Sequence, residues 1–513
     1  MSSSPFFTQT DYAMILPITL LALFALFILV FDVLAPEFKR LIPYVALGGL
    51  FFAASGITGL PAIWRFRDTE GIYRHVEMLR LHGLPPQLAL SGSMLIDALT
   101  VYFWSLFLVA AAISILISIH YLDEEGEQHP EYYALILFAV VGMMCMAAAV
   151  DMVLIFISLE LMAISTYVLV GFLRGNRRSN EASLKYLLLG AFSSGIFAYG
   201  LSLFYGLTGY TNLLRISQTL NRYSEITRHP SPVAVLALLA TATGLLFKIA
   251  AVPFHQWAPD AYEGAPTSIT AFMSVAVKAA AWAMLLRVLV FGLGPLYTIW
   301  TPVIIFVAIA TMTGANLAAL TQTNLKRLLA YSSIAHVGYM LLGLVALTTT
   351  EAARDALKGI LVYLVVYTFM NLGAFAVITS LRHRNVIGDE IDDIAGLYSR
   401  APIEAVLMLI FLLSLAGIPP LAGFYGKYFI FLSLIESHHY VLASLGVAYS
   451  VFGLYYYLKI ANAVFMREPL ESEKLPISFS MGLALAITAA ATFGIGVYPE
   501  PFLRAVNWSL GLG

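Results

Sequence analysis

The most regular feature of the chain is a recurring apolar run of about 20 residues, the length that crosses a bilayer core as a helix. Within each run the apolar residues are continuous, whereas the strands of a membrane barrel would alternate with polar residues. The pattern predicts about fourteen spanning helices, at about 12–34, 42–61, 95–120, 132–150, 151–173, 181–207, 233–257, 266–290, 297–320, 327–346, 356–381, 403–435, 440–466 and 477–498.

Two of these predicted helices are interrupted by proline in the middle of an apolar run. The seventh reads LFKIAAVPFHQW around Pro253, and the twelfth reads SLAGIPPLAGFYGK around Pro419 and Pro420. Proline removes an amide donor and displaces a carbonyl of the preceding turn, so the freed carbonyls must be covered by protein or line a hydrated cavity. Interrupted helices at corresponding positions of two halves are typical of inverted repeats around a midplane site.

We therefore expect an all-α polytopic membrane protein with two inverted five-helix repeats, helices 4–8 and 9–13, in which helices 7 and 12 are broken. The corresponding division of the chain is residues 1–130 for the N-terminal helices 1–3, 131–292 for the first repeat, 293–467 for the second repeat and 468–513 for the C-terminal helix 14.

Composition supports the membrane class and argues against several functions. Hydrophobic residues make up 60% of the chain and charged residues 11%, with a mean hydropathy of +0.85, whereas soluble domains carry about 25% charged residues. A net charge of −2 points to no particular partner. Cys145 is the only cysteine, and the chain has no CxxC pair, no GxGxxG after a strand and no Walker A loop. No cofactor or metal site is therefore expected on this chain.

The loops bear on orientation in the membrane. An even number of spans places both termini on one side, and the first apolar run is too long for a signal peptide. On the opposite side, lysine and arginine lie in short loops such as that of Arg174, Arg177 and Arg178. On the side of the termini they are concentrated in long loops, which count less in the positive-inside rule. This favours termini outside the cytoplasm.

Five lysines lie inside predicted spans: Lys185, Lys248, Lys278, Lys427 and Lys459. A charge at the bilayer centre costs about 2.5–3.5 kcal/mol on insertion scales, so each needs a reason. Snorkelling of the side chain to the interface accounts for Lys459 and is one of two open readings of Lys185. It fails for Lys248, Lys278 and Lys427, which lie deep in their spans. We interpret these three as proton carriers.

Glu160 is the main acidic candidate, because it lies mid-span in DMVLIFISLELMAIS. A lysine partner would let the pair exchange a proton when a neighbouring charge moves. The alternative is a static ion pair between helices, although such pairs stabilise poorly.

Two histidines, His255 and His336, are candidate proton relays, since an unperturbed histidine titrates near pH ~6.5. Packing is the alternative for both, and neither belongs to a metal-binding set such as HExxH. Other polar residues of the spans are expected to pack, hold water or lie at the interface: Tyr331, Tyr339, Tyr363, Tyr367, Asp97 and Glu404.

Three stretches carry a family resemblance: FKIAAVPFHQWAPDAYEGAPTSITAF, NLKRLLAYSSIAHVGYMLLG and GLYSRAPIEAVLMLIFLLSLAGIPPLAGFYGKYFIF. Through them the chain resembles, over nearly its whole length, the antiporter-like subunits of proton-translocating NADH:quinone oxidoreductase (respiratory complex I) and their cation/proton antiporter relatives. Among the three such subunits it looks most like subunit N. Lys427 disfavours subunit M, which looks glutamate-like there, and a chain of fourteen helices lacks the lateral helix of subunit L.

The resemblance implies roles for the site residues. Glu160 of helix 5 would pair with Lys248 of helix 7, Lys278 would link two half-channels, and Lys427 would face the exit side. Lys185 matches a helix 6 lysine of subunit N.

The implied function is proton pumping within a bacterial type I NADH:quinone oxidoreductase, in the cell inner membrane and with both termini periplasmic. The partners would be other membrane-arm subunits. NADH, FMN, iron–sulfur clusters and quinone are expected on those partner subunits. A cation/proton antiporter subunit and a non-pumping structural scaffold remain the alternatives.

Overall fold

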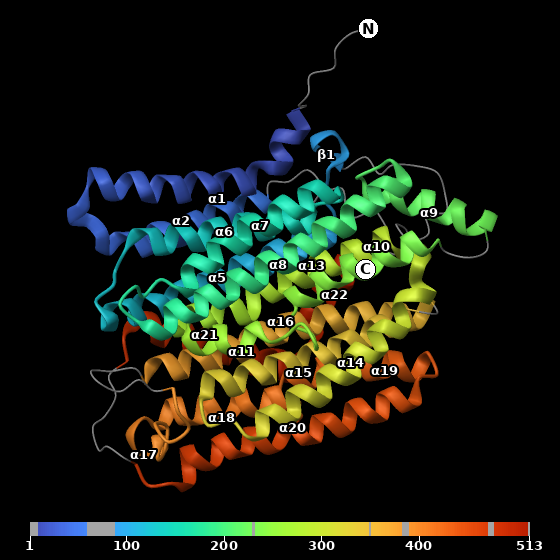
Figure 1. The fold of residues 1–513 in the computed structure, drawn as a ribbon. Helices are drawn as coiled ribbons and strands as arrows, with labels where there is room; N and C mark the ends of the chain where they lie inside the picture. The colour runs from blue at the N-terminus through green and yellow to red at the C-terminus, as the bar shows by residue number, and fades with distance from the viewer. Residues whose placement is uncertain are drawn as a thin grey trace.

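The computed structural model describes residues 9–58, 88–227, 231–347, 350–381, 389–469 and 477–510. These residues form a bundle of helices that run side by side (Figure 1), with one short antiparallel pair of strands, β1 (Leu88–Ala89) and β2 (Met94–Leu95). Within these ranges, twelve helices are long and apolar enough to cross a membrane. The segment between the second and third predicted spans, which contains Arg65, Arg67, Arg74 and Arg80, lies mostly outside the described residues.

The first half of the chain contains α1 (Gln9–Leu34), α2 (Ile42–Thr58), α5 (Ala98–Glu125), α6 (Pro130–Ala148), α7 (Met152–Val170), α8 (Arg177–Thr208), α9 (Leu213–Thr227), α10 (Pro232–Lys248), α11 (Trp257–Gly264), α12 (Thr267–Phe272), the π-helical η4 (Met273–Val277), α13 (Lys278–Leu285) and the π-helical η5 (Leu286–Gly292). Short 3₁₀ turns occur at η1 (Pro36–Leu41), η3 (Leu90–Gly92) and η6 (Gly294–Leu296).

The second half contains α14 (Tyr297–Leu320), α15 (Leu325–Val345), α16 (Thr350–Ser380), α17 (Leu397–Arg400), α18 (Pro402–Ala416), α19 (Gly423–Glu436), α20 (Tyr440–Met466), α21 (Phe479–Val497) and α22 (Glu500–Ser509).

Both predicted breaks are confirmed. The first interrupts a span between α10 and α11, where Ala250 has φ of 60°, and the second lies between α18 and α19, where Gly417 has φ of 87°. Because α10 and α18 have only 17 and 15 residues, neither crosses a bilayer alone. The predicted count of about fourteen therefore requires counting each broken helix as one span beside the twelve long ones.

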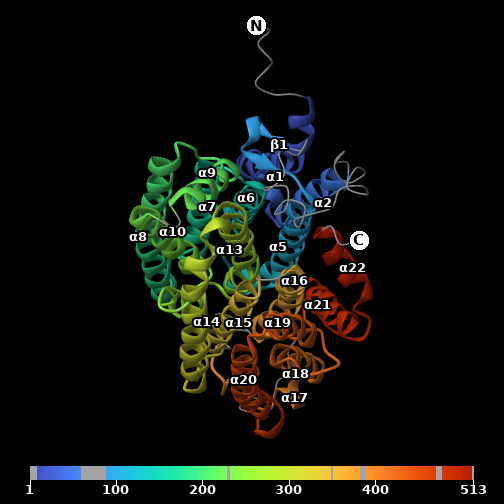
Figure 2. The ribbon, with the colours of Figure 1, turned by 90° about the vertical axis from the view of Figure 1, so that its right-hand side faces the viewer.

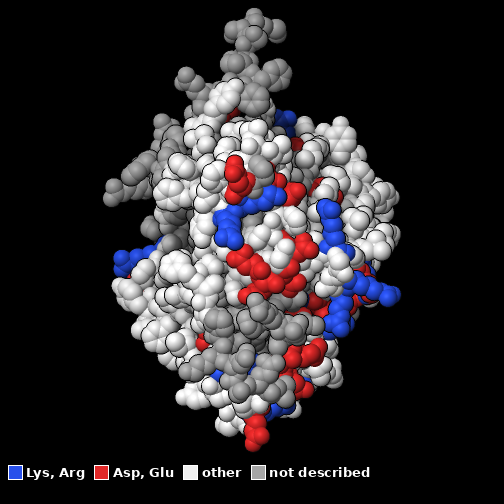
Figure 3. All heavy atoms as spheres, turned by 90° about the vertical axis from the view of Figure 1, so that its left-hand side faces the viewer, with Lys and Arg blue, Asp and Glu red and all other residues white. Residues whose placement is uncertain are grey.

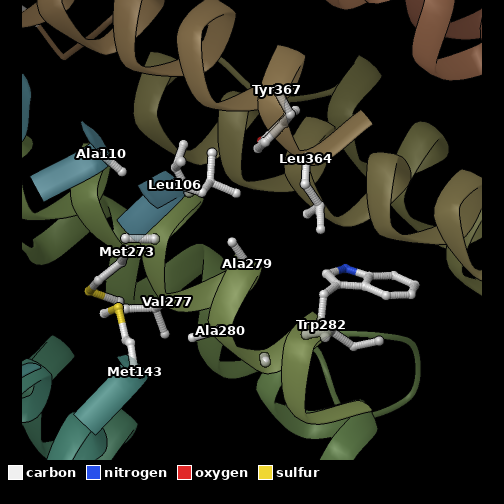
Figure 4. Close-up of a cluster of buried hydrophobic side chains, with 14 of the residues drawn as sticks. Leu106, Ala110, Met143, Met273, Val277, Ala279, Ala280, Trp282, Leu364 and Tyr367 are labelled. Atoms are coloured by element: carbon white, nitrogen blue, oxygen red, sulfur yellow. The ribbon is translucent and has the colours of Figure 1, made fainter. Parts of the chain in front are cut away.

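The centre of the bundle is formed by the continuous span Thr267–Gly292, which runs from α12 to η5, together with α15 and α16, and these three are the most deeply buried spans. Figure 4 shows side chains of this first span, including Met273, Val277 and Trp282, between α5, α6 and α16. The helices α1, α8 and α20 lie at the periphery (Figure 2) and expose apolar side chains, as expected for surfaces that meet lipid or other subunits.

Charged side chains gather where the helices end. Figure 3 views the molecule along the helices of Figure 1, from its left-hand side, and shows mixed acidic and basic groups on that face. The opposite end of the bundle, on the right in Figure 1, is where α1 begins and where α22 lies. Charges at the left-hand end of this bundle of apolar helices are expected where a polytopic membrane protein meets water.

Two helices were not predicted. α9 lies between the sixth and seventh predicted spans, and α22 follows the last one, in stretches to which the sequence pattern assigned no helix. α9 buries Leu213, Ile216 and Leu220 on one side, a helical spacing within an otherwise polar segment. A search for long apolar runs misses such amphipathic helices, because only one face is apolar.

Close helix contact depends on glycine at the α6–α7 interface. A Cβ at Gly142 would lie 2.7 Å from the Met162 backbone nitrogen and 2.9 Å from the Ser158 carbonyl oxygen, whereas a Cβ at Gly195 on α8 would meet nothing within 4 Å. Backbone atoms cannot rotate aside as a side chain can. Gly142 and Gly195 therefore serve as a test position and its control for substitution by alanine.

We expect Gly142→Ala to destabilise the protein by about 1–3 kcal/mol through overpacking. Gly195→Ala should be neutral or stabilising by up to about 1 kcal/mol, from its gain in helix propensity. Thermal stability of the assembled, detergent-solubilised protein measures both. Equal stability of the two variants would contradict the close contact at Gly142.

Candidate functional site

Lys248 is the last residue of α10 and is buried, with 1% of its surface exposed. Its Nζ donates a hydrogen bond to Tyr167 Oη at 3.4 Å, and it lies 5.4 Å and 5.8 Å from the ring centres of Tyr167 and Tyr186. Aromatic faces attract an ammonium ion, and so does the negative end of the helix dipole. The break after α10 thus creates a place where a buried lysine is stabilised by dipoles.

Glu160 lies on α7, two turns before Tyr167. Its Oε1 is buried and has no hydrogen-bonding partner in the protein, and no direct ion pair joins Glu160 to Lys248. Glu160 and Lys248 interact with each other electrostatically at longer range. Tyr167 interacts with both, electrostatically with Glu160 and through a hydrogen bond with Lys248. The structure therefore brings Glu160 and Lys248 into one cluster with Tyr167 at its centre. The direct pairing expected from the family resemblance is absent from this arrangement.

Lys278 follows the π-helical segment η4 and is 3% exposed. Its Nζ donates a hydrogen bond to the Ser333 hydroxyl of α15, and the ring centre of Tyr262 on α11 lies 5.6 Å away. One turn earlier, Ser274 accepts a hydrogen bond of 2.6 Å from the Asn371 amide of α16. π-helical segments are frequent at functional sites, and this one places a lysine against α15.

His336 lies one turn after Ser333 on α15 and is 2% exposed. Its Nδ1 is 2.5 Å from Tyr363 Oη and its Nε2 is 3.0 Å from Tyr457 Oη, so both ring nitrogens have hydroxyl partners. The Tyr457 hydroxyl also forms a hydrogen bond with the Ser332 hydroxyl, with 2.5 Å between the two oxygens. A histidine between two hydroxyls can accept a proton on one side and give one up on the other.

Lys427 lies on α19, just after the second break, and is 7% exposed. Its Nζ donates to the Ala416 carbonyl oxygen, the last of α18, at 2.8 Å, and lies 5.0 Å from the ring centre of Tyr339. A cavity of about 410 Å³ adjoins Lys427 and is lined mostly by apolar residues of α19 and α20, with Ser450 among them. The carbonyl that a helix break frees is here the partner of a lysine.

One face of α15 connects these groups. Ser333, His336 and Tyr339 follow one another at three-residue spacing, which places them on one side of a helix. The first contacts Lys278, the last faces Lys427, and His336 interacts electrostatically with both lysines. The sequence had suggested His336, but it assigned Tyr339 to packing or water and missed Ser333. The three-residue spacing in SSIAHVGY was the available signal.

Lys185 and His255 lie apart from this row. The Lys185 side chain is 45% exposed and forms ion pairs with Glu181 and Asp260, each at 2.9 Å. His255 lies in the segment between α10 and α11 and is partly buried, and its Nδ1 has no partner within the protein. Neither residue contacts Lys248, Lys278 or Lys427, so their roles in proton transfer stay predictions.

Lys459 donates to the carbonyl oxygens of Leu320 and Gln322 at 3.5 and 2.9 Å, at the C-terminal end of α14. A cation there satisfies helix-end carbonyls and is favoured by the helix dipole. This contact agrees with a structural role for Lys459. Glu404 lies in the first turn of α18 and is 3% exposed, and its Oε1 has no partner in the protein. Its expected position at the interface stays a prediction.

Arg287 of η5 is a buried charge that the sequence analysis did not single out, and it is 0% exposed. Its guanidinium donates to both Asp97 carboxylate oxygens at 2.8 and 2.6 Å, to Thr100 Oγ1 at 2.8 Å and to the Ala147 carbonyl at 3.1 Å. Asp97 also caps the N-terminal end of α5 and is 8% exposed. Such a bidentate, fully bonded pair joins α5, α6 and η5 rigidly.

Across the residues that the structure describes, no group of three or more histidine, cysteine, aspartate or glutamate side chains could hold a metal ion. The groups assembled here are lysine, histidine, glutamate and hydroxyls, which transfer protons. The arrangement supports proton transfer as its chemistry.

Comparison with known proteins agrees with this geometry. The family described as "NADH:quinone oxidoreductase/Mrp antiporter, TM" matches residues 149–453. The chain is 60% identical over 509 residues to NADH-quinone oxidoreductase subunit N 1 of Koribacter versatilis, covering 98% of this chain and 96% of that protein. It is 50% identical to NADH-quinone oxidoreductase subunit N 2 of Solibacter usitatus, covering 99% of each.

Solved structures show the same fold. A chain of respiratory complex I from Thermus thermophilus with bound aureothin matches with a TM-score of 0.73 and 29% identity, covering 96% of this chain and 99% of that one. A chain of the membrane-bound sulfane sulfur reductase, an archaeal respiratory membrane complex, matches with a TM-score of 0.81 and 25% identity, covering 97% of each.

The fold and the buried lysines define an antiporter-like, multi-pass membrane protein. The chain belongs to the NADH:quinone oxidoreductase/Mrp antiporter family, and within it to the subunit N group of respiratory complex I. It is a proton-translocating membrane-arm subunit of a multi-subunit NADH-quinone oxidoreductase, whose other membrane-arm subunits are its partners.

The Asp97–Arg287 pair gives a stability prediction. Arg287→Met leaves a buried carboxylate without its cation and should destabilise the protein by about 3–5 kcal/mol. The double variant Asp97→Asn/Arg287→Met removes both charges while asparagine keeps the helix cap, so it should be more stable than Arg287→Met. Thermal unfolding of the assembled protein measures this. A double variant less stable than Arg287→Met would contradict a mutually dependent pair.

Proposed function

We propose that this chain carries protons along a buried row that begins at Lys248, passes Lys278 and His336 and ends at Lys427. The observation that supports the row best is the face of α15, which presents Ser333 to Lys278 and Tyr339 to Lys427 with His336 between them. Hydroxyls and a histidine between lysines are groups through which a proton can be handed on.

The energetic basis of transfer is that no carboxylate is bonded directly to any of the three lysines. Lys248 contacts a tyrosine hydroxyl, Lys278 a serine hydroxyl and Lys427 a backbone carbonyl. Burial without a directly bonded carboxylate penalises the ammonium form, so charged and neutral lysine become closer in free energy than they are in water. A lysine that gains a proton then raises the cost of charge on its neighbour, which favours stepwise transfer.

Glu160 is the control point in this proposal. Its Oε1 lacks a protein partner, and it interacts with Tyr167, the group that Lys248 contacts. A change at Glu160 would therefore alter the proton affinity of Lys248. One charge moved across 100 mV costs about 2.3 kcal/mol, and each tenfold change in proton affinity is about 1.4 kcal/mol. A ten- to hundredfold change in the proton affinity of Lys248 is therefore comparable to the energy needed to move one charge across the membrane.

The energy would come from partner subunits, where we place NADH, FMN, the iron–sulfur clusters and quinone. We place the chain in the cell inner membrane with both termini periplasmic. The two broken helices would belong to the two repeats at 131–292 and 293–467, with Lys248 in the first and Lys427 in the second. His255, beside the first break, is a candidate for proton entry.

Two other functions make different predictions. A scaffold would keep the complex together while all intramembrane lysines were dispensable. A cation/proton antiporter would work without redox partners. The high identity to oxidoreductase N subunits over nearly the full chain favours redox-driven pumping.

Replacing the buried lysine tests the proposal. In a complex reconstituted into liposomes, Lys248→Met should lower the rate of proton pumping by about tenfold or more, because a titrating group is lost from the row. The matched control is Lys459→Met, which removes a lysine that contacts only helix-end carbonyls among the described residues. It should pump as the wild type does.

Pumping is measured as acidification of the vesicle lumen during NADH oxidation, with assembly checked by subunit content. Wild-type pumping by an assembled Lys248→Met complex would refute the proposed row and favour a scaffold.

A further inference from the structure

The short helix α11 carries two aromatic side chains that form the surroundings of the buried lysines. The Trp257 ring stacks on Tyr186 with ring centres 4.4 Å apart and planes at 11°, and its Nε1 donates to the Phe247 carbonyl oxygen at 2.9 Å. Tyr186 in turn faces Lys248, and Tyr262 faces Lys278 at 5.6 Å. The position of α11 therefore fixes aromatic contacts of both lysines.

The backbone alone anchors α11 poorly. It has eight residues and follows the interrupted segment after α10, so it is not the continuation of a rigid helix. A helix of this length is marginal without tertiary contacts. Side chains from its neighbours α8 and α15 must therefore hold it in place.

Charged side chains of α8, α11 and α15 supply those contacts. Asp260 accepts from Lys185 Nζ of α8 at 2.9 Å and from Arg327 Nη1 of α15 at 2.8 Å. Glu263 accepts from the same Arg327 Nη1 at 2.9 Å. Lys326, 2% exposed, donates to the carbonyl oxygen of Ala265 at the C-terminal end of α11, at 2.8 Å.

These contacts form a clamp, defined here as Lys185, Asp260, Glu263, Lys326 and Arg327. Within the described chain, Asp260 is the one carboxylate of α11 that bonds to both neighbouring helices. α15 contributes twice, since it begins with the clamp residues Lys326 and Arg327 and continues to Ser333, which holds Lys278. The clamp thus connects α11 to the helix that carries the central part of the row.

We infer that Asp260 is a positioning residue for proton transfer, which tethers α11 between α8 and α15 so that Trp257 and Tyr262 keep their places beside Tyr186 and Lys278. This inference rests on the proposed proton row. It also gives Lys185 a role: it anchors α11 from α8 and lies outside the row. A lysine whose partners are two carboxylates differs in surroundings from the three buried lysines.

The test replaces Asp260 in the assembled complex. Asp260→Asn keeps the size of the side chain and removes its charge. The matched control is Asp392→Asn, which breaks another aspartate–arginine pair, that of Asp392 and Arg467 at 2.5 Å, neither of which belongs to the clamp. Two measurements are made: the pH profile of proton pumping in liposomes, and amide hydrogen exchange of the peptide that contains α11.

Asp260→Asn should lower pumping about two- to tenfold, the range of mutations that act through a contact network, and shift its pH profile. Amide exchange of α11 should become faster. Asp260→Glu should restore most of the pumping, and Asp392→Asn should match the wild type in both measurements. Wild-type pumping, pH profile and α11 exchange in Asp260→Asn would overturn the inference.

Two further variants make the outcomes unambiguous. If Asp260→Asn does not assemble, Glu263→Gln removes one contact of Arg327 and should speed exchange of α11 by a smaller factor, and unchanged exchange there would overturn the clamp. If Lys248→Met pumps normally, the proposed proton row fails. If Lys248→Met is inactive while Asp260→Asn behaves as Asp392→Asn does, only the clamp fails.

Discussion

The site depends on the free-energy cost of burying three lysines that have no directly bonded carboxylate. Lys248, Lys278 and Lys427 are each less than a tenth exposed, and each contacts a hydroxyl, a carbonyl or an aromatic face. Dipoles of this kind compensate an ammonium ion incompletely, which leaves its proton exchangeable. Arg287 shows the opposite arrangement in the same protein, because its guanidinium has a bidentate carboxylate partner in Asp97.

Four features of the fold surround the buried lysines with hydroxyls, carbonyls and aromatic faces: the two helix breaks and the helices α11 and α15. One break ends α10 at Lys248, and the other frees the Ala416 carbonyl that Lys427 uses. α15 supplies Ser333 and Tyr339 to two different lysines, and α11 brings Tyr262 to Lys278. Interrupted helices are costly in a membrane unless protein covers the freed backbone. Here that backbone becomes part of the site.

Much of the fold could be predicted from the chain, because apolar run length and proline position report directly on spans and breaks. The deep lysines were found for the same reason, as charges in apolar runs. The hydrogen-bonding and ion-pair partners of the buried charges could not be predicted in this way. Arg287 lies near the end of its span, and its partner Asp97 is 190 residues away, so only tertiary packing pairs them. Lys185 resembled a buried lysine by sequence, yet it lies at a half-exposed helix surface with Asp260. α9 and α22 were missed because one-sided apolar faces leave no continuous run.

His336 lies at the centre of the row, between Lys278 and Lys427, so its replacement tests the account most directly. Glutamine at this position can hydrogen-bond to the hydroxyls of Tyr363 and Tyr457 but cannot take up a proton near neutral pH. The measurement is the number of protons pumped per NADH oxidised by the His336→Gln complex in liposomes. The account predicts a lower ratio than that of the wild type, with the complex fully assembled. An unchanged ratio at an unchanged rate would contradict a proton path along α15.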